Sequence, residues 1–357
     1  MGRVRFGFHT GYWGAGPPPG AADAVVAAER LGFDSVWTAE AYGSDALTPL
    51  AWWGAATSRV LLGTAVAQMA ARTPTATAMA AMTLDHLSGG RFALGLGASG
   101  PQVVEGWYGQ PFERPLARTR EYVAVVRDVV ARRGPVVADG ELIRLPYRPP
   151  SAGGGDDTAP RLGKPLRSTL HPLRPDLPVH LAAEGPRSIA LAAEIADGWL
   201  PLFLAPRLDG DYRELLAEGF ARRSPALRPP VEFEVSAIVP VAVDDDVARA
   251  ADRIRPFLAL YVGGMGARGA NFHHAAVARL GYGDAAREVQ ERFLAGDRAG
   301  AAAAIPDELV DDVALVGPPA RVRERLAAWE SSVVTRLVVA TDPRALPAVA
   351  AALGLTP

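Results

Sequence analysis

Several side chains in the first part of the sequence could take part in acid–base or hydrogen-bonding chemistry. His9 ends an apolar run, where an imidazole either donates a proton near neutral pH or serves as a packing residue. Glu40 follows a second apolar run, and its carboxylate could accept hydrogen bonds from a bound ring or from backbone amides. Tyr12 and Tyr42 are further candidates for a proton donor. We therefore predict His9, Tyr12 and Tyr42 as catalytic candidates and Glu40 as a ligand-binding residue.

The stretch LGLGASGPQ places Gly95, Gly97 and Gly100 in the spacing G-x-G-x-x-G. That spacing marks a dinucleotide site only where it opens a helix directly and an acid that binds the ribose follows about 20 residues later. Here Pro101 and the later GWYGQPFERP are interpreted as loop, and Glu121, the acid at that distance, lies inside a predicted amphipathic helix. The glycines are therefore interpreted as serving another purpose than a Rossmann fingerprint.

Metal and nucleophile chemistry receive no support from the sequence. The chain has no cysteine, which excludes disulfides, thiolate nucleophiles and zinc–thiolate sites. His273 and His274 are adjacent on a predicted extra helix without a third ligand at metal spacing, and no Ser-His-Asp order stands out. We expect no metal and no catalytic triad.

Composition and charge limit the classes of molecule that this protein is expected to bind. The 357 residues are 49% hydrophobic and 21% charged, enough to bury a large core. A net charge of −2 without a Lys/Arg-rich run gives no positive electrostatic field that would attract nucleic acid. The amino-terminal MGRVRFGFH lacks the apolar region of a signal peptide, and no stretch approaches the 18 apolar residues of a membrane span. We expect a soluble cytoplasmic protein with no membrane or nucleic-acid partner.

The order of elements indicates the fold. Short apolar runs alternate with amphipathic helical stretches, as in a parallel sheet covered by crossover helices. We predict eight strands, at Val4–His9, Ser35–Thr38, Val60–Val66, Phe92–Gly97, Val179–Ala182, Gly198–Leu202, Phe233–Val241 and Leu337–Ala340. Helices are predicted at Ala21–Leu31, Pro49–Ala56, Pro74–Leu87, Leu116–Arg132, Pro186–Ile195, Asp211–Arg222, Asp245–Val262 and Pro343–Ala352. The pattern favours one α/β domain over 1–357, a (β/α)8 TIM barrel, with a doubly wound open sheet as the alternative.

Two stretches interrupt the alternation and are interpreted as insertions in the barrel. Residues 134–178 are rich in Pro and Gly, and Ser151–Leu166 within them is predicted to be a mobile flap. Residues 271–329 are predicted to hold several extra helices.

The carboxyl ends of the predicted strands share small and aromatic residues. In a barrel these ends meet at one mouth. Small residues there would let the backbone approach a flat ring, or would simply allow tight turns: Ala65, Ala67, Ala98, Ser99 and Gly100. Aromatic residues that could cover such a ring, or belong to the core, are Trp13, Tyr42, Trp107 and Tyr108. Gly185, Pro186 and Arg187 open a predicted helix and could bind a phosphate, or form an ordinary helix start.

Four segments resemble the luciferase-like monooxygenase superfamily: VWTAEAYGSD, VLLGTAVAQMAARTP, DHLSGGRFALGLGASGPQVVEGWYG and AAEGPRSIALAAEIADGWLP. Within it the chain is similar to the branch of oxidoreductases that use the deazaflavin coenzyme F420. The resemblance implies a bacterial luciferase-like (β/α)8 barrel with the deazaflavin over the third strand end, beside a cis Ala65–Val66 peptide. It also implies the cofactor-binding residues Glu40, Ala65, Val66, Gln68, Ala98, Ser99, Gly100, Glu184, Gly185, Pro186 and Arg187.

The resemblance also implies a reaction. We expect hydride transfer between F420 and a small organic substrate, through reduction of a C=C, C=N or C=O bond, and a homodimer by family habit. Alternatives are a two-component monooxygenase using FMN and oxygen, or a non-catalytic protein that binds a flavin or deazaflavin. Related sugar-phosphate dehydrogenases carry His and Glu where this chain has Ala41 and Gly100, so oxidation of glucose 6-phosphate is not expected.

Overall fold

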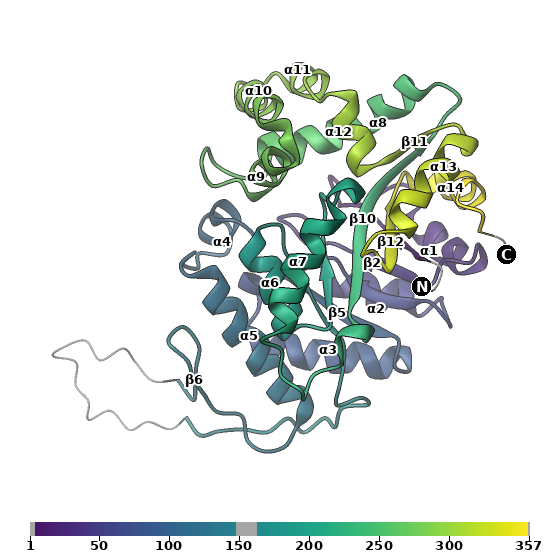
Figure 1. The fold of residues 1–357 in the computed structure, drawn as a ribbon. Coiled ribbons are helices and arrows are strands. Elements are labelled where there is room, and N and C mark those ends of the chain that lie inside the picture. Colours follow the sequence, from purple (N-terminus) through teal and green to yellow (C-terminus); the bar gives the residue numbers. More distant parts are fainter. Residues whose placement is uncertain (1–3, 148–162, 356–357) are drawn as a thin grey trace.

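A closed barrel of eight parallel strands forms the centre of the protein (Figure 1), seen in a computed structural model that describes residues 4–147 and 163–355. The strands are β1 (Arg5–His9), β2 (Ser35–Thr38), β3 (Leu61–Thr64), β5 (Phe92–Gly97), β8 (Val179–Ala182), β9 (Gly198–Leu200), β10 (Glu234–Val243) and β12 (Arg336–Ala340). They pair in this order, and β12 pairs with β1 to close the ring. The predicted (β/α)8 barrel is confirmed, as is the place of each strand.

Helices surround the barrel. Those packed on its outer surface are α1 (Ala21–Arg30), α2 (Leu47–Gly54), α3 (Pro74–Ser88), α5 (Pro115–Ala131), α6 (Pro186–Ile195), α7 (Asp209–Phe220), α13 (Pro319–Glu330) and α14 (Leu346–Ala352). Apolar residues of these helices and of the outward-facing strand positions form one continuous core. No helix in residues 4–147 and 163–355 is long and apolar enough to cross a membrane.

The barrel interior is filled by Trp37, which is fully buried. Its indole fits because two neighbouring strands carry glycine beside it. A Cβ on Gly7 would lie 2.8 Å from Trp37 Nε1, and a Cβ on Gly63 would collide with the ring itself. The indole N–H donates to Ser35 Oγ over 2.9 Å. One large side chain and two glycines therefore pack together in this layer.

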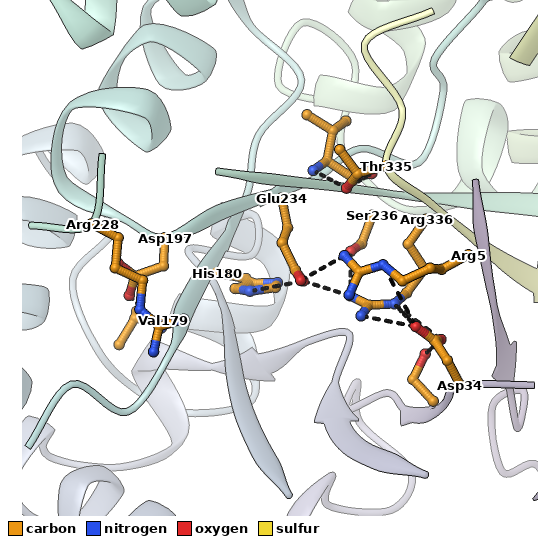
Figure 2. Close-up of polar contacts among 12 residues, drawn as sticks. Arg5, Asp34, Val179, His180, Asp197, Arg228, Glu234, Ser236, Thr335 and Arg336 are labelled. Atoms are coloured by element: carbon orange, nitrogen blue, oxygen red, sulfur yellow. Dashed lines mark hydrogen bonds and ion pairs between the residues drawn. The ribbon is translucent and has the colours of Figure 1, made fainter. Parts of the chain in front are cut away.

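A charge network centred on the buried Arg336 side chain lies at the amino-terminal end of the barrel. Figure 2 shows the Arg336 guanidinium between the carboxylates of Asp34 and Glu234, with distances of 3.1 Å from Nε to Asp34 Oδ1 and 2.6 Å from Nη1 to Glu234 Oε2. Arg5 donates to the other Glu234 oxygen over 2.6 Å, and His180 Nε2 lies 3.7 Å from Glu234. These groups join the first residues of several strands, so they stabilise the amino-terminal end of the barrel.

Further helices follow β10 and gather at the top of the view in Figure 1. They are α8 (Val247–Ala259), the π-helical turn η4 (Leu260–Gly264), α9 (Phe272–Val277), a second π-helical turn η5 (Ala278–Tyr282), α10 (Gly283–Leu294), α11 (Arg298–Ala303) and α12 (Asp307–Val313), then the short strand β11 (Leu315–Gly317) beside β10. The boundary differs from the predicted insertion 271–329. Helix α8 packs with the extra helices, whereas α13 belongs to the barrel core, because Val322, Leu326 and Trp329 face that core.

The shorter elements correct or extend the sequence predictions. Pro101–Gly106 forms helix α4 in place of the expected loop, and β6 (Ala138–Asp139) pairs with β7 (Arg144–Leu145) as a hairpin. The Glu121 carboxylate accepts the backbone N–H groups of residues 141–143 in this hairpin, so it supports the hairpin and not a ribose. Of the predicted flap Ser151–Leu166, residues 151–162 lie outside the described residues. The remaining short elements are β4 (Ala67–Gln68), η1 (Met69–Ala71), η2 (Pro206–Leu208), η3 (Pro230–Glu232) and η6 (Pro343–Ala345).

Candidate active site at the barrel mouth

The turn after β3 contains the cis peptide Ala65–Val66, which confirms the expectation from the resemblance. The chain then re-enters the sheet as β4, whose Ala67 and Gln68 pair with Leu96 and Gly97 of β5. A Cβ on Gly97 would lie 2.5 Å from Val66 Cγ2, and one on Gly95 would collide with the Thr64 carbonyl. These two glycines of the G-x-G-x-x-G spacing therefore let β5 pack against this turn.

Glu40 lies beside this turn and is buried. Its Oε2 accepts the Gln68 N–H over 2.8 Å, and the Arg72 guanidinium donates to both carboxylate oxygens over 2.8 and 2.7 Å. Of the two roles considered for Glu40, binding of backbone amides is the one that its contacts display. The guanidinium of Arg72, which the sequence gave no reason to single out, adds a charge partner.

Gln68 carries a second feature of this site. Its side-chain N–H group donates to the Glu40 carbonyl over 3.0 Å, while its Oε1 is buried with no hydrogen-bond partner among the described residues. A buried acceptor without a partner is costly, and such atoms are normally met by a ligand or a water molecule.

His9 lies on the other side of the turn, at the end of β1. Its Nδ1 accepts the Gly11 N–H over 3.0 Å, and the ring also hydrogen-bonds to the backbone of Ala65. Burial lowers the pKa of His9 to about 4, so the ring is neutral near pH 7. Because the ring is buried and neutral and its Nδ1 accepts a backbone N–H, these contacts favour a positioning role over the proton-donor role that the sequence suggested.

The two tyrosines proposed as proton donors differ in setting. Tyr12 is partly buried and accepts the Tyr261 hydroxyl over 2.7 Å, whereas the Tyr42 side chain is 57% exposed. Burial raises the pKa of Tyr12 and raises that of Tyr261 well above its ordinary value, so both hydroxyls stay protonated. Tyr12 therefore lies at the mouth as a neutral hydrogen-bonding group.

Ala98, Ser99 and Gly100 follow β5 and precede α4. Ser99 has a φ of 59°, a left-handed conformation that non-glycine residues rarely adopt. Gly100 is the residue before the first helical position, and a Cβ there would come within 4.0 Å of Phe272 on α9. The extra helices therefore reach over this strand end.

The segment Glu184–Arg187 follows β8 and begins helix α6. Pro186 is the first helical residue, the Gly185 N–H donates to Ser188 Oγ over 3.1 Å, and Arg187 is exposed. Glu184 pairs with His273 of α9, and its carbonyl accepts from Arg279 over 2.6 Å. The sequence had placed Glu184 here but gave no signal for these two partners.

A cleft of about 380 Å³ adjoins this strand end. Apolar and charged residues line it, including Glu184, Pro186, Trp199, Phe203, Asp211, Arg279 and Leu280. The candidate site thus consists of the residues around the β3 turn and a cleft beside the end of β8. In residues 4–147 and 163–355, no cluster of three metal-ligating side chains was found.

Comparison with known proteins identifies the class of protein. The family model of the luciferase-like monooxygenases matches residues 5–336, so the chain belongs to this family. A Mycobacterium tuberculosis protein named "putative coenzyme F420-dependent oxidoreductase" is 56% identical over 336 residues, or 94% of each chain. The 5,10-methylenetetrahydromethanopterin reductase of Methanolobus tindarius is 31% identical, over 66% of this chain and 65% of its own length. The solved structure of the coenzyme F420-dependent tetrahydromethanopterin reductase of Methanopyrus kandleri has a TM-score of 0.78 at 22% identity, covering 98% of both chains, and supports the shared fold.

Proposed function

We propose that this protein is an oxidoreductase that transfers a hydride between coenzyme F420 and a small organic substrate, by reduction of a C=C, C=N or C=O bond. The family and the 56% identical relative support the cofactor class. The unpartnered Gln68 Oε1 beside Val66 carries the proposal within the structure, because a planar ring with N–H groups would satisfy this acceptor.

The residues at the mouth fit such a cofactor. Ala65 and Val66 would support one face of the ring, Gln68 would bind its edge, and Ala98, Ser99 and Gly100 would line the ring and the adjoining chain. Gly185, Pro186 and Arg187 would bind the phosphate at the start of α6, where helix amides and a guanidinium favour an anion. The cofactor would supply the hydride, and the protein would orient it and exclude water.

Difference spectroscopy tests the cofactor before any substrate is known. We expect F420 to perturb the spectrum with a Kd at least about tenfold lower than that of FMN, a difference of about 1.4 kcal/mol. Tighter binding of FMN, with rapid oxygen consumption and oxygen in the product, would instead establish a monooxygenase. Binding of F420 without oxidation of its reduced form by any unsaturated acceptor would establish a non-catalytic binding protein.

A further inference from the structure

A histidine–carboxylate pair lies across the barrel mouth, outside the catalytic residues considered above. His273 Nδ1 is 2.8 Å from Glu184 Oε1, with the His273 side chain 24% exposed and that of Glu184 12% exposed. Because an ionised carboxylate only accepts hydrogen bonds, Nδ1 carries the shared hydrogen. In the described part of the chain no hydrogen bond engages His273 Nε2, so this nitrogen is available to another group.

The His273 ring is held from several sides. It packs perpendicular to the Tyr261 ring, with centroids 4.8 Å apart at 89°, and edge-on to Phe203 at 5.8 Å. Asn271 fixes the backbone, because its Oδ1 accepts the His273 N–H over 2.9 Å while its Nδ2 donates to the Tyr261 carbonyl over 3.0 Å. Such packing and hydrogen bonding hold a side chain in one orientation, as an acid–base group requires.

The pair lies where the extra helices meet the mouth. Glu184 follows β8, and Tyr261 donates to Tyr12 after β1. Phe272, the residue before His273, is the neighbour of Gly100 after β5. Three strand ends that converge on the proposed ring site therefore lie around His273.

One carboxylate oxygen of Glu184 is available to bind a ligand. Its Oε2 is buried without a hydrogen-bond partner in the part of the chain that the structure describes. Glu184 and Phe203 also line the cleft of about 380 Å³. Glu184 thus links His273, by their hydrogen bond, to a space large enough for a small organic molecule.

We propose that His273, oriented by Glu184, is the catalytic residue that exchanges a proton with the substrate. This inference rests on the proposed function, with reduced F420 as the hydride source. As the hydride adds to one atom of the substrate double bond, the π electron pair moves to the other atom, which takes the proton from Nε2 of the imidazolium. The cofactor is oxidised, the substrate is reduced, and His273 regains its proton from water. In oxidation the same steps run backwards.

The other polar groups around the pair have different tasks. Tyr261 and Tyr12 share a hydrogen bond and position the ring, and the guanidinium of Arg279 binds the Glu184 carbonyl. Glu184 is the group that balances the charge of an imidazolium, as the carboxylate does in a catalytic triad. His9 fits this task less well, because its buried ring is neutral near pH 7 and its Nδ1 accepts the Gly11 N–H.

Nitrogen NMR of the histidine-labelled protein tests the pairing without turnover. We expect the neutral His273 ring to show the Nδ1–H tautomer in the wild type and a mixture in Glu184→Ala, with the signal assigned by its loss in His273→Asn. A wild-type ring in the Nε2–H tautomer would overturn the inference, because Nδ1 would then not donate to Glu184.

Kinetics tests proton exchange, with 2-cyclohexen-1-one and related enones, imines and ketones as acceptors for reduced F420. His273→Asn keeps a donor toward Glu184 but cannot carry a proton, so we expect kcat to fall about 100-fold, with the pH dependence of this step lost. The spectroscopic Kd for F420 should change less than about threefold. We expect Glu184→Gln to reduce kcat at least about tenfold, because a neutral amide does not balance the charge of the imidazolium.

His274→Asn is the matched control, because His274 lies on the same helix and no polar contact of its ring is seen within the described residues. It should keep wild-type kcat. If His273→Asn is folded, binds F420 and keeps the wild-type kcat and pH profile, the inference fails while the proposed function stands. If the wild type reduces none of these acceptors, the proposed function fails, and the inferred proton exchange fails with it even where NMR supports the pairing.

Discussion

The Arg72 guanidinium holds the buried Glu40 carboxylate through two hydrogen bonds of 2.8 and 2.7 Å. This pair ties the segment after η1 to the end of β2, and Glu40 in turn holds Gln68. Two segments beside the β3 turn are therefore held together by one ion pair. The carboxylate is 3% exposed, so these partners take the place of water around it.

Replacement of Arg72 by Met should lower the free energy of unfolding by about 3 kcal/mol, because it leaves the Glu40 charge buried without its cation. Urea unfolding at pH 7 measures this. Arg287→Met is the control, since Arg287 and Asp284 form an exposed pair on α10 and its loss should have little effect. Similar stability of the two variants would contradict the role assigned to Arg72.

Replacement of Gly63 by Ala should lower the free energy of unfolding by about 2 kcal/mol, because the added Cβ would collide with the Trp37 ring in a filled layer. Thermal unfolding measures the change. Gly106→Ala serves as the comparison, since a Cβ there has no neighbour within 4 Å. The packing argument is wrong if Gly63→Ala melts at the wild-type temperature.

Acidification should destabilise the protein in two overlapping ranges. Burial lowers the pKa of His180 to about 4 from its ordinary 6.5. As the pH falls, the unfolded chain therefore binds a proton at His180 at a higher pH than the folded protein does, and stability falls between pH 6.5 and 4. Although burial opposes its charge, Arg336, His180 and Arg5 lower the pKa of Glu234 from 4.5 to about 2. The stability that depends on ionised Glu234 is present above pH 4.5 and is lost as the pH falls toward 2.

Urea unfolding at several pH values checks this dependence. Because His9 has the same pKa of about 4, each of the two histidines should contribute a slope of about 1.4 kcal/mol per pH unit between pH 6.5 and 4. His180→Gln should show a shallower slope over this range. An unchanged slope would mean that His180 is not buried as a neutral ring.

Replacement of Gln68 by Ala should raise the Kd for F420 about tenfold, because the variant loses the unpartnered acceptor assigned to the ring. Titration of F420 fluorescence measures the Kd, and thermal unfolding checks that the variant is folded. Wild-type affinity in a folded Gln68→Ala protein would remove Gln68 from the cofactor site.

The barrel and the location of its mouth could be predicted from the sequence, because they depend on local patterns. Runs such as Ser35–Thr38 and Phe92–Gly97 are buried throughout, which alternation with amphipathic helices already indicates for strands of a parallel barrel. The residues just after such runs, including Glu40 and Ser99, must then lie at one end. The sequence therefore predicts the end of the barrel at which these residues lie, although it does not give their contacts.

Only the tertiary structure decided which side chains meet. Glu184 and His273 are 89 residues apart, Glu40 and Arg72 are 32 apart, and Asp34 and Arg336 are 302 apart. Nothing in a local pattern distinguishes Arg72 from other arginines, or His273 from His274. Closure of the barrel and packing of the extra helices bring these groups within hydrogen-bond distance. The low polarity around them strengthens each hydrogen bond and raises the cost of losing it. The sequence alone determined where chemistry could take place, and the packed fold decided which atoms are placed to carry it out.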